Sequence, residues 1–186
     1  MRDGALGHDP IPLVTETFIA AVYTPPEARS SELRAAVATS DQLISELKAA
    51  TEYVFGVPMY NFSVPAGFKA YIDQIVIPGR TYRIDESGCK KGLLREKKAT
   101  VITSSGWLFR SGSPLAPHNH QEPWIRTILG FIGVTNVDFV VADGLGEVER
   151  GKHEREQYLQ PIREEVLRKA RLRSPVNPIG AQCCPR

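Results

Sequence analysis

The chain has 186 residues, of which 42% are hydrophobic and 24% are charged, and its formal net charge is +2. This composition excludes an intrinsically disordered chain, and the small net charge argues against a protein that binds nucleic acid through its overall charge. The length predicts one domain, spanning residues 1–186, that buries roughly 70% of the surface of the unfolded chain. Its partners should be small molecules or proteins.

The sequence also indicates where the protein works. No apolar run approaches the roughly 18 residues that a membrane span needs, and residues 1–4 (MRDG) do not begin an apolar signal-peptide core. Cys89 stands alone and Cys183 is adjacent to Cys184, so the cysteines predict neither a disulfide framework nor a zinc site. We therefore expect a cytoplasmic protein that binds no membrane.

The first predicted helix follows an irregular start. Residues 1–29 are rich in proline, glycine and short apolar clusters, so we expect no regular structure there. Between Ser30 and Ala50 apolar residues recur at helical spacing, and a serine at the start can cap the helix. The next run, 53–58 (YVFGVP), is short and continuously apolar, which is typical of a strand covered on both faces.

The same alternation continues along the chain. Residues 68–75 have the apolar spacing of a second helix, which the Pro-Gly pair at 78–79 must end. A strand is predicted at 99–103 (ATVIT), a helix at 124–132 and a third strand at 137–142. Helices that alternate with buried strands in this way predict right-handed βαβ units around a parallel sheet.

A polar helix is predicted from about residue 147 to residue 169, distorted by Pro161, and residues 174–186 should form a flexible tail. In parallel sheets of this type, ligands bind beyond the carboxyl ends of the strands. Two loops occupy such positions, at 58–65 and 104–112.

The first loop reads PMYNFSVP, and it combines a thioether, two aromatic rings and an amide. These groups suit a flat conjugated ligand, although the same side chains could simply close the end of the core. The second loop begins TSSGW, whose small residues let a ligand approach the backbone, but taken alone this pattern is better explained by ordinary turn chemistry.

Two other kinds of site can be considered. His118 and His120 are metal-ligand types, but no carboxylate or cysteine lies at helpful spacing, so we expect no metal site. A hydrolase could use Ser104 or Ser105 with His118 and Asp143, but the sequence has no Gly-x-Ser-x-Gly elbow and only geometry can decide.

The PMYNF string at 58–62, the GFIG turn at 130–133 and the order of elements resemble the FMN-dependent NADH-azoreductases, also described as NADH:quinone oxidoreductases. The resemblance runs from about Pro10 through the final helix. It implies an α/β, flavodoxin-like three-layer sandwich with a parallel sheet. It also implies a homodimeric flavoprotein that transfers electrons from NADH or NADPH to quinones or azo compounds in a ping-pong cycle, with no catalytic side chain.

In the family the first loop lines the isoalloxazine ring of FMN, and the second loop usually reads Ser-Arg-Gly-Gly. Ser104 and Gly106 match that second pattern, whereas Ser105 and Trp107 depart from it. The resemblance therefore implies a set of cofactor-binding residues in the two loops: Met59, Tyr60, Asn61, Phe62, Ser104, Ser105, Gly106 and Trp107.

The chain departs from the family at its front. Members begin with a strand, a Ser-rich phosphate-binding loop and the helix that follows, none of which the sequence contains, so the fold is expected to be truncated at the N-terminus. The missing strand is central in the order 2-1-3-4-5, which predicts a small sheet with a hydrophobic edge. Either the true start lies upstream of Met1, or the chain is a non-catalytic fragment or interaction protein that has lost FMN binding.

Overall fold

The computed structural model describes residue 6 and residues 9–171. The predicted tail at 174–186, with Cys183 and Cys184, lies outside the described residues. The helices are α1 (Glu16–Tyr23), α2 (Ser31–Ala49), α3 (Ala66–Ile75), α4 (Gln121–Phe131), α5 (Leu145–Glu149) and α6 (Arg155–Arg171), with single 3₁₀ turns at Pro26–Ala28 and Ala116–His118. The strands are β1 (Glu52–Pro58), β2 (Tyr82–Ile84), β3 (Lys90–Gly92), β4 (Lys98–Ser105) and β5 (Asn136–Asp143).

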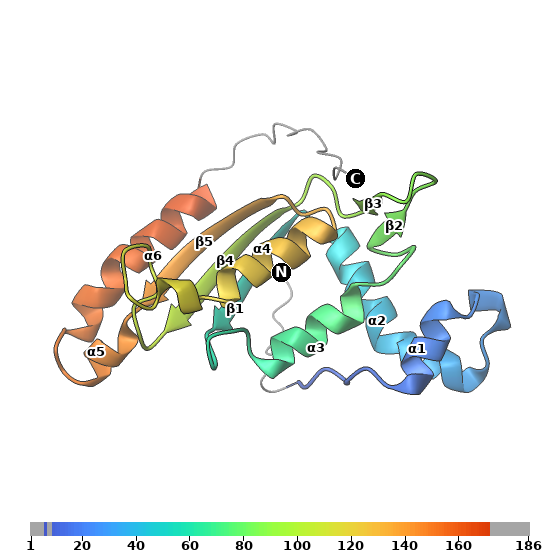
Figure 1. Ribbon diagram of the computed structural model, residues 1–186, viewed down its shortest axis with the longest axis horizontal. Helices are drawn as coiled ribbons and strands as arrows, with labels where there is room; N and C mark the ends of the chain where they lie inside the picture. The colour runs from blue at the N-terminus through green and yellow to red at the C-terminus, as the bar shows by residue number, and fades with distance from the viewer. Residues whose placement is uncertain (1–5, 7–8, 172–186) are drawn as a thin grey trace.

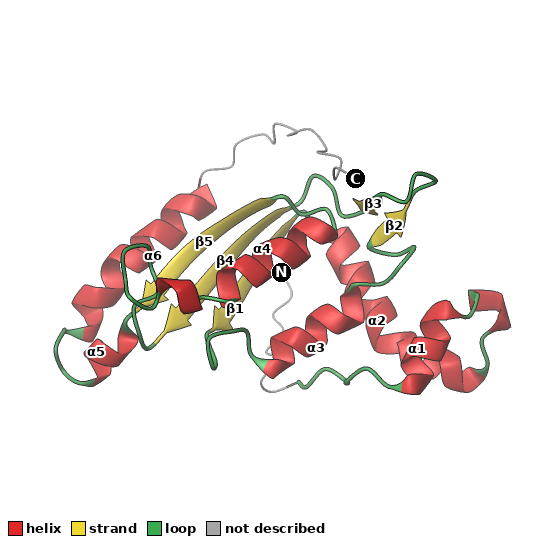
Figure 2. Ribbon diagram, viewed as in Figure 1, coloured by secondary structure: helices red, strands yellow, loops and turns green. Residues whose placement is uncertain are grey.

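The central sheet is parallel and has the order β1-β4-β5, as the alternation of elements predicts. Phe55 of β1 is in register with Val101 of β4, which is in register with Phe139 of β5. The three strands therefore end at the same edge, where their arrowheads lie together in Figure 2. The loops after β1 and β4 leave the sheet side by side.

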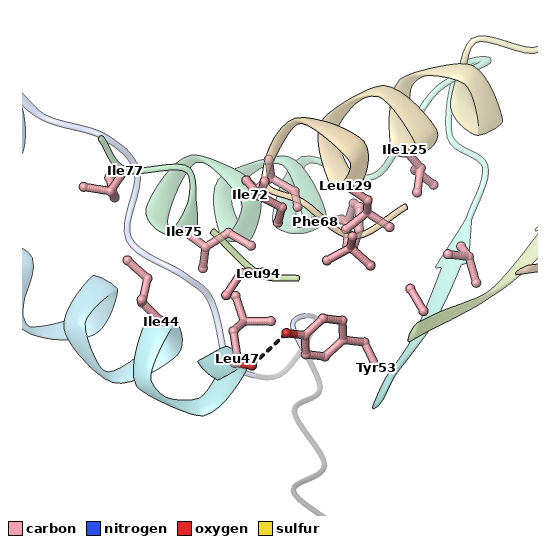
Figure 3. Close-up of a cluster of buried hydrophobic side chains, with 14 of the residues drawn as sticks. Ile44, Leu47, Tyr53, Phe68, Ile72, Ile75, Ile77, Leu94, Ile125 and Leu129 are labelled. Atoms are coloured by element: carbon pink, nitrogen blue, oxygen red, sulfur yellow. Dashed lines mark hydrogen bonds between the residues drawn. The ribbon is translucent and has the colours of Figure 1, made fainter. Parts of the chain in front are cut away.

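The core lies between one face of this sheet and the helices α2, α3 and α4 (Figure 3). Ile44, Ile72 and Ile125 come from these three helices and are almost completely buried. Tyr53 of β1 closes the core and donates a hydrogen bond from its hydroxyl to the carbonyl oxygen of Leu47 at 2.7 Å. Burial disfavours the phenolate and raises the pKa of Tyr53 to about 12.

The opposite face of the sheet is only partly covered. Helix α6 packs on β5 (Figure 1), where Val140 is fully buried. On β1 the side chain of Val54 is 68% exposed, so the prediction that this strand is covered on both faces is wrong. Strand β1 also has a hydrogen-bonded neighbour on one side only within the described chain, so the predicted edge is present.

The N-terminal segment is more regular than predicted. Helix α1 forms within residues 1–29, where the side chain of Thr15 accepts a hydrogen bond from the N–H of Phe18 at 3.1 Å. The helix packs on α2 and buries Phe18 and Ala21. With only 8 residues it is too short for a clear periodic signal, and tertiary packing supplies its stability.

A second element that the sequence did not reveal is the antiparallel hairpin β2–β3. Its strands have 3 residues each, and Ile84 is 61% exposed, so there is no apolar run to detect. The hairpin is attached to the end of α4 through backbone contact, because Leu94 N–H donates to the carbonyl oxygen of Ile132 at 2.9 Å. A Cβ atom on Gly92 would lie 2.1 Å from the backbone nitrogen of Gly133, so only glycine fits there.

The predicted final helix is divided in two. Helix α5 ends at Glu149 and α6 begins at Arg155, with Gly151 between them at a φ of 72°. Glycine adopts this left-handed conformation readily, and it breaks the helix. Pro161 lies within α6 and does not end it. No helix in the described part of the chain is long and apolar enough to cross a membrane.

Candidate functional site

The loop after β1 forms a tight turn with an unusual backbone. Tyr60 N–H donates to the carbonyl oxygen of Ser63 at 3.0 Å, and Ser63 N–H donates to that of Tyr60 at 3.1 Å. The central residues Asn61 and Phe62 both have positive φ, 48° and 68°. Such a turn normally takes Asn, Asp or Gly, so Phe62 is a strained choice at this position.

The loop after β4 is fixed through its backbone. The carbonyl oxygen of Trp107 accepts hydrogen bonds from the Ser105 hydroxyl at 2.8 Å and from Gly144 N–H at 3.1 Å. The carbonyl oxygen of Gly106 accepts from Gly146 N–H at 3.0 Å. A Cβ atom on Gly146 would lie 2.8 Å from that oxygen, so glycine permits the loop to rest on α5.

Asp143 at the end of β5 holds the next part of this loop. One carboxylate oxygen of Asp143 accepts hydrogen bonds from the N–H groups of Phe109 at 3.1 Å and Arg110 at 3.3 Å. The Tyr158 hydroxyl of α6 donates to the carbonyl oxygen of Asp143. Burial, and then the negative charge of Asp143, raise the pKa of Tyr158. Asp143 thus has a positioning role behind the site.

The two loops enclose a pocket of about 310 Å³. Its lining combines residues from both loops: Met59, Asn61, Phe62, Ser105, Gly106, Trp107, Phe109 and Leu115. Two residues predicted for the site do not line it. The Tyr60 side chain is 60% exposed, and Ser104 contributes its carbonyl oxygen to Met59 N–H at 2.7 Å.

Sequence reasoning missed Phe109 and Leu115. Phe109 packs edge-to-face on Phe62 with ring centroids 6.1 Å apart, so it supports the strained turn from the second loop. The only signal was that both are apolar residues a few positions beyond the TSSGW segment. Neither follows a strand directly, and no periodic pattern marks them.

The two histidines considered as metal ligands lie beside this turn. The His118 ring is 6.1 Å from the Phe62 ring, and His120 N–H donates to the carbonyl oxygen of Phe62 at 3.1 Å. Among the described residues no hydrogen bond joins His118 to Ser105 or Asp143, as a hydrolase triad would need. Nor does any cluster of three or more metal-ligand types occur in that part of the chain.

The chemistry of the lining suits a flat conjugated ring. A thioether and two phenyl rings offer apolar contacts, and the Asn61 side chain makes no hydrogen bond to another described residue. The Ser105 hydroxyl donates to Trp107, so its lone pairs can accept. None of the eight lining residues is charged, so the pocket fits the ring of a flavin but offers no cation for its phosphate.

Comparison with known proteins places this geometry in context. Residues 5–166 match the family described as having a flavodoxin-like fold. The chain is 51% identical over 142 residues to an FMN-dependent NADH:quinone oxidoreductase of Nostoc punctiforme, covering 76% of this chain and 69% of the relative. It is 45% identical over 161 residues to FMN-dependent NADH:quinone oxidoreductase 2 of Trichormus variabilis, covering 87% and 76%.

Solved structures agree with the sequence matches. The crystal structure of azoreductase AzrA has a TM-score of 0.78 and 25% sequence identity to this chain, and the match covers 89% of this chain and 78% of AzrA. An azoreductase from Bacillus anthracis has the same TM-score, with 26% identity and the same coverage.

Proposed function

Because the chain belongs to the family with a flavodoxin-like fold, together with the FMN-dependent NADH:quinone oxidoreductases, we propose that it is an FMN-dependent oxidoreductase. It transfers electrons from NADH or NADPH to quinones or azo compounds, the activities named in its relatives. The observation that carries the proposal is the apolar pocket between two strand-end loops, with the strained Asn61-Phe62 turn on one side.

The residues of the two loops would hold the flavin ring. Met59 and Phe62 would pack on the ring. The Asn61 amide, which bonds no other described residue, and the Ser105 hydroxyl would bond its polar edge. Gly106 lets the ring approach the backbone. FMN, when bound, supplies the electron-transfer chemistry, so the protein needs no nucleophile or metal. The phosphate would be held by groups other than the eight lining residues.

The pocket between the two loops also supports a ping-pong order of reaction. Both site loops converge on one cavity of about 310 Å³, which is at the lower limit for small-molecule sites. A flavin ring would fill most of this cavity, so a nicotinamide donor and a quinone acceptor would meet the same exposed side of the ring in turn. The donor's product must leave before the acceptor enters.

We also propose that the protein forms a homodimer. Apolar side chains on and before α1 are exposed, with Leu13 and Tyr23 both 73% exposed. Tyr23, with Val14 and Ile19, lines a hollow of about 370 Å³ between α1 and the end of α3. An apolar surface of this kind is typical of an association site. Light scattering during gel filtration should give the mass of a dimer, and Ile19→Lys on this surface should reduce it toward that of a monomer.

The proposed activity is tested with purified protein, added FMN, NADH and a simple quinone. The expected result is quinone reduction above a protein-free control that contains the same FMN, with parallel double-reciprocal plots as both substrates are varied. Failure to exceed that control would favour the alternative, a flavodoxin-like protein that has lost FMN binding.

A further inference from the structure

Trp107 combines a fixed backbone with a free side chain. Its carbonyl oxygen accepts two hydrogen bonds, and the carbonyl oxygen of the neighbouring Gly106 accepts one from the N–H of Gly146 in α5. The side chain is nevertheless 67% exposed, and no aromatic ring of the described residues stacks on it. The indole therefore adds little to core packing, and it leaves a large aromatic surface free to contact a ligand.

The other tryptophan shows the contrast. Trp124 of α4 is partly buried against the core, and its ring lies edge-on to Phe68 at 6.4 Å. Trp107 instead lines the site pocket together with Asn61 and Phe62. Phe62, which is 50% exposed, presents a second aromatic surface to the same space.

We propose that Trp107 is a stacking platform for the electron acceptor, and not the flavin contact that the family resemblance implies, and that it favours neutral acceptors with two fused rings over those with one ring. The inference rests on the proposed function and names its substrate class. An indole has a two-ring face, so a fused two-ring quinone gains more contact than a single ring does. The absence of charged groups among the eight lining residues favours a neutral acceptor.

Binding is tested first by fluorescence, without turnover. The chain has 2 tryptophans, so Trp124→Phe leaves Trp107 as the only indole, and Trp107→Phe leaves Trp124. Each variant is titrated with 2-methyl-1,4-naphthoquinone and with tetramethyl-1,4-benzoquinone, with and without FMN. Trp107 emission should be quenched saturably by the two-ring quinone and only linearly by the one-ring quinone. Trp124 emission should show no saturable phase.

Kinetics then separate acceptor binding from flavin binding. Trp107→Ala should raise the KM for the two-ring quinone about three- to tenfold. The KM for the one-ring quinone and for NADH, and the Kd for FMN, should change less than about twofold, and Trp107→Phe should recover part of the loss. Ile84→Ala, which shortens another exposed side chain far along the chain from the site, is the matched control.

Each contrary result has a distinct meaning. A larger Kd for FMN in Trp107→Ala would show that Trp107 contacts the flavin, and it would overturn the proposal. Equal effects on both quinones, or linear quenching of Trp107 by both, would also overturn it. Absence of FMN binding and turnover in the unchanged chain would refute the proposed function instead, while the FMN-free titration would still decide whether Trp107 binds the two-ring quinone.

Discussion

The backbone N–H of Met59 donates to the carbonyl oxygen of Ser104 at 2.7 Å. This bond continues the parallel ladder one residue beyond the Pro58–Ser104 pair, so the two site loops leave the sheet already joined. Their separation is therefore set by the spacing of neighbouring strands and not by loop packing alone. A rigid sheet edge of this kind supports a preorganised site.

Asp143 should be necessary for both stability and cofactor affinity. Asp143→Ala leaves the N–H groups of Phe109 and Arg110 without their acceptor, which should lower the free energy of unfolding by about 1–3 kcal/mol. Because the second loop loses its support, the Kd for FMN should rise about tenfold. Urea unfolding and flavin fluorescence measure the two effects. Asp138→Asn, which removes only an ion pair with Lys98 at 3.4 Å, should change neither appreciably.

Because Phe62 has a positive φ, we expect glycine to be tolerated better than alanine at this position. Phe62→Ala and Phe62→Gly both remove the ring, but only glycine adopts a φ of 68° freely. The glycine variant should therefore be more stable than the alanine variant by about 1 kcal/mol, measured by urea unfolding. At Val54, in the extended strand β1, the order should be reversed. Equal stability of the two Phe62 variants would show that the turn stores no strain.

The sequence predicted the parallel sheet and helices α2, α3 and α4 because these elements are long and strongly patterned. It did not predict α1, the β2–β3 hairpin or the break at Gly151. These depend on packing against α2, on the Gly92–Gly133 contact and on one backbone conformation, and none of the three has a periodic signature.

The site was predictable to the extent that it follows directly after strands. The loops at 58–65 and 104–112 were identified because β1 ends at Pro58 and β4 ends beside it, and the family resemblance named residues in them that line the pocket: Met59, Asn61, Phe62, Ser105, Gly106 and Trp107. Phe109 lines the pocket where Asp143 accepts a hydrogen bond from its backbone N–H, and Leu115 lines it where its N–H donates to the Ser113 hydroxyl. A carboxylate on β5 that bonds backbone N–H groups leaves no pattern in the sequence.

The contact between the hairpin and α4 should tolerate no side chain. Gly92→Ala would place a Cβ atom 2.1 Å from the nitrogen of Gly133 and 2.3 Å from the carbonyl carbon of Ile132. The free energy of unfolding should fall by more than about 3 kcal/mol, because backbone must move on both sides. Gly56→Ala, where no atom lies within 4 Å of the new Cβ, should change it by less than about 1 kcal/mol. A mild effect at Gly92 would mean that the hairpin does not rest on α4.

Alkaline unfolding should depend on Tyr53. Its pKa in the folded chain is about 12, above the ordinary value of 10.0, so between these values the unfolded chain loses the proton first. The stability due to this group is therefore complete below pH 10 and falls as the pH rises toward 12. Tyr53→Phe should remove about 1–2 kcal/mol of that alkaline loss, measured as urea unfolding at pH 9 and pH 11.5. An identical pH dependence in both proteins would contradict the assignment.

The pocket between the two strand-end loops should bind the flavin ring, and direct titration with FMN tests this binding. Flavin fluorescence should change saturably as the purified protein is added, with one FMN per chain. The Kd should rise at least tenfold in Phe62→Ala and remain unchanged in Glu96→Gly, a variant of a positive-φ residue outside the pocket lining. Absence of saturable binding, or equal affinity in Phe62→Ala, would contradict the account.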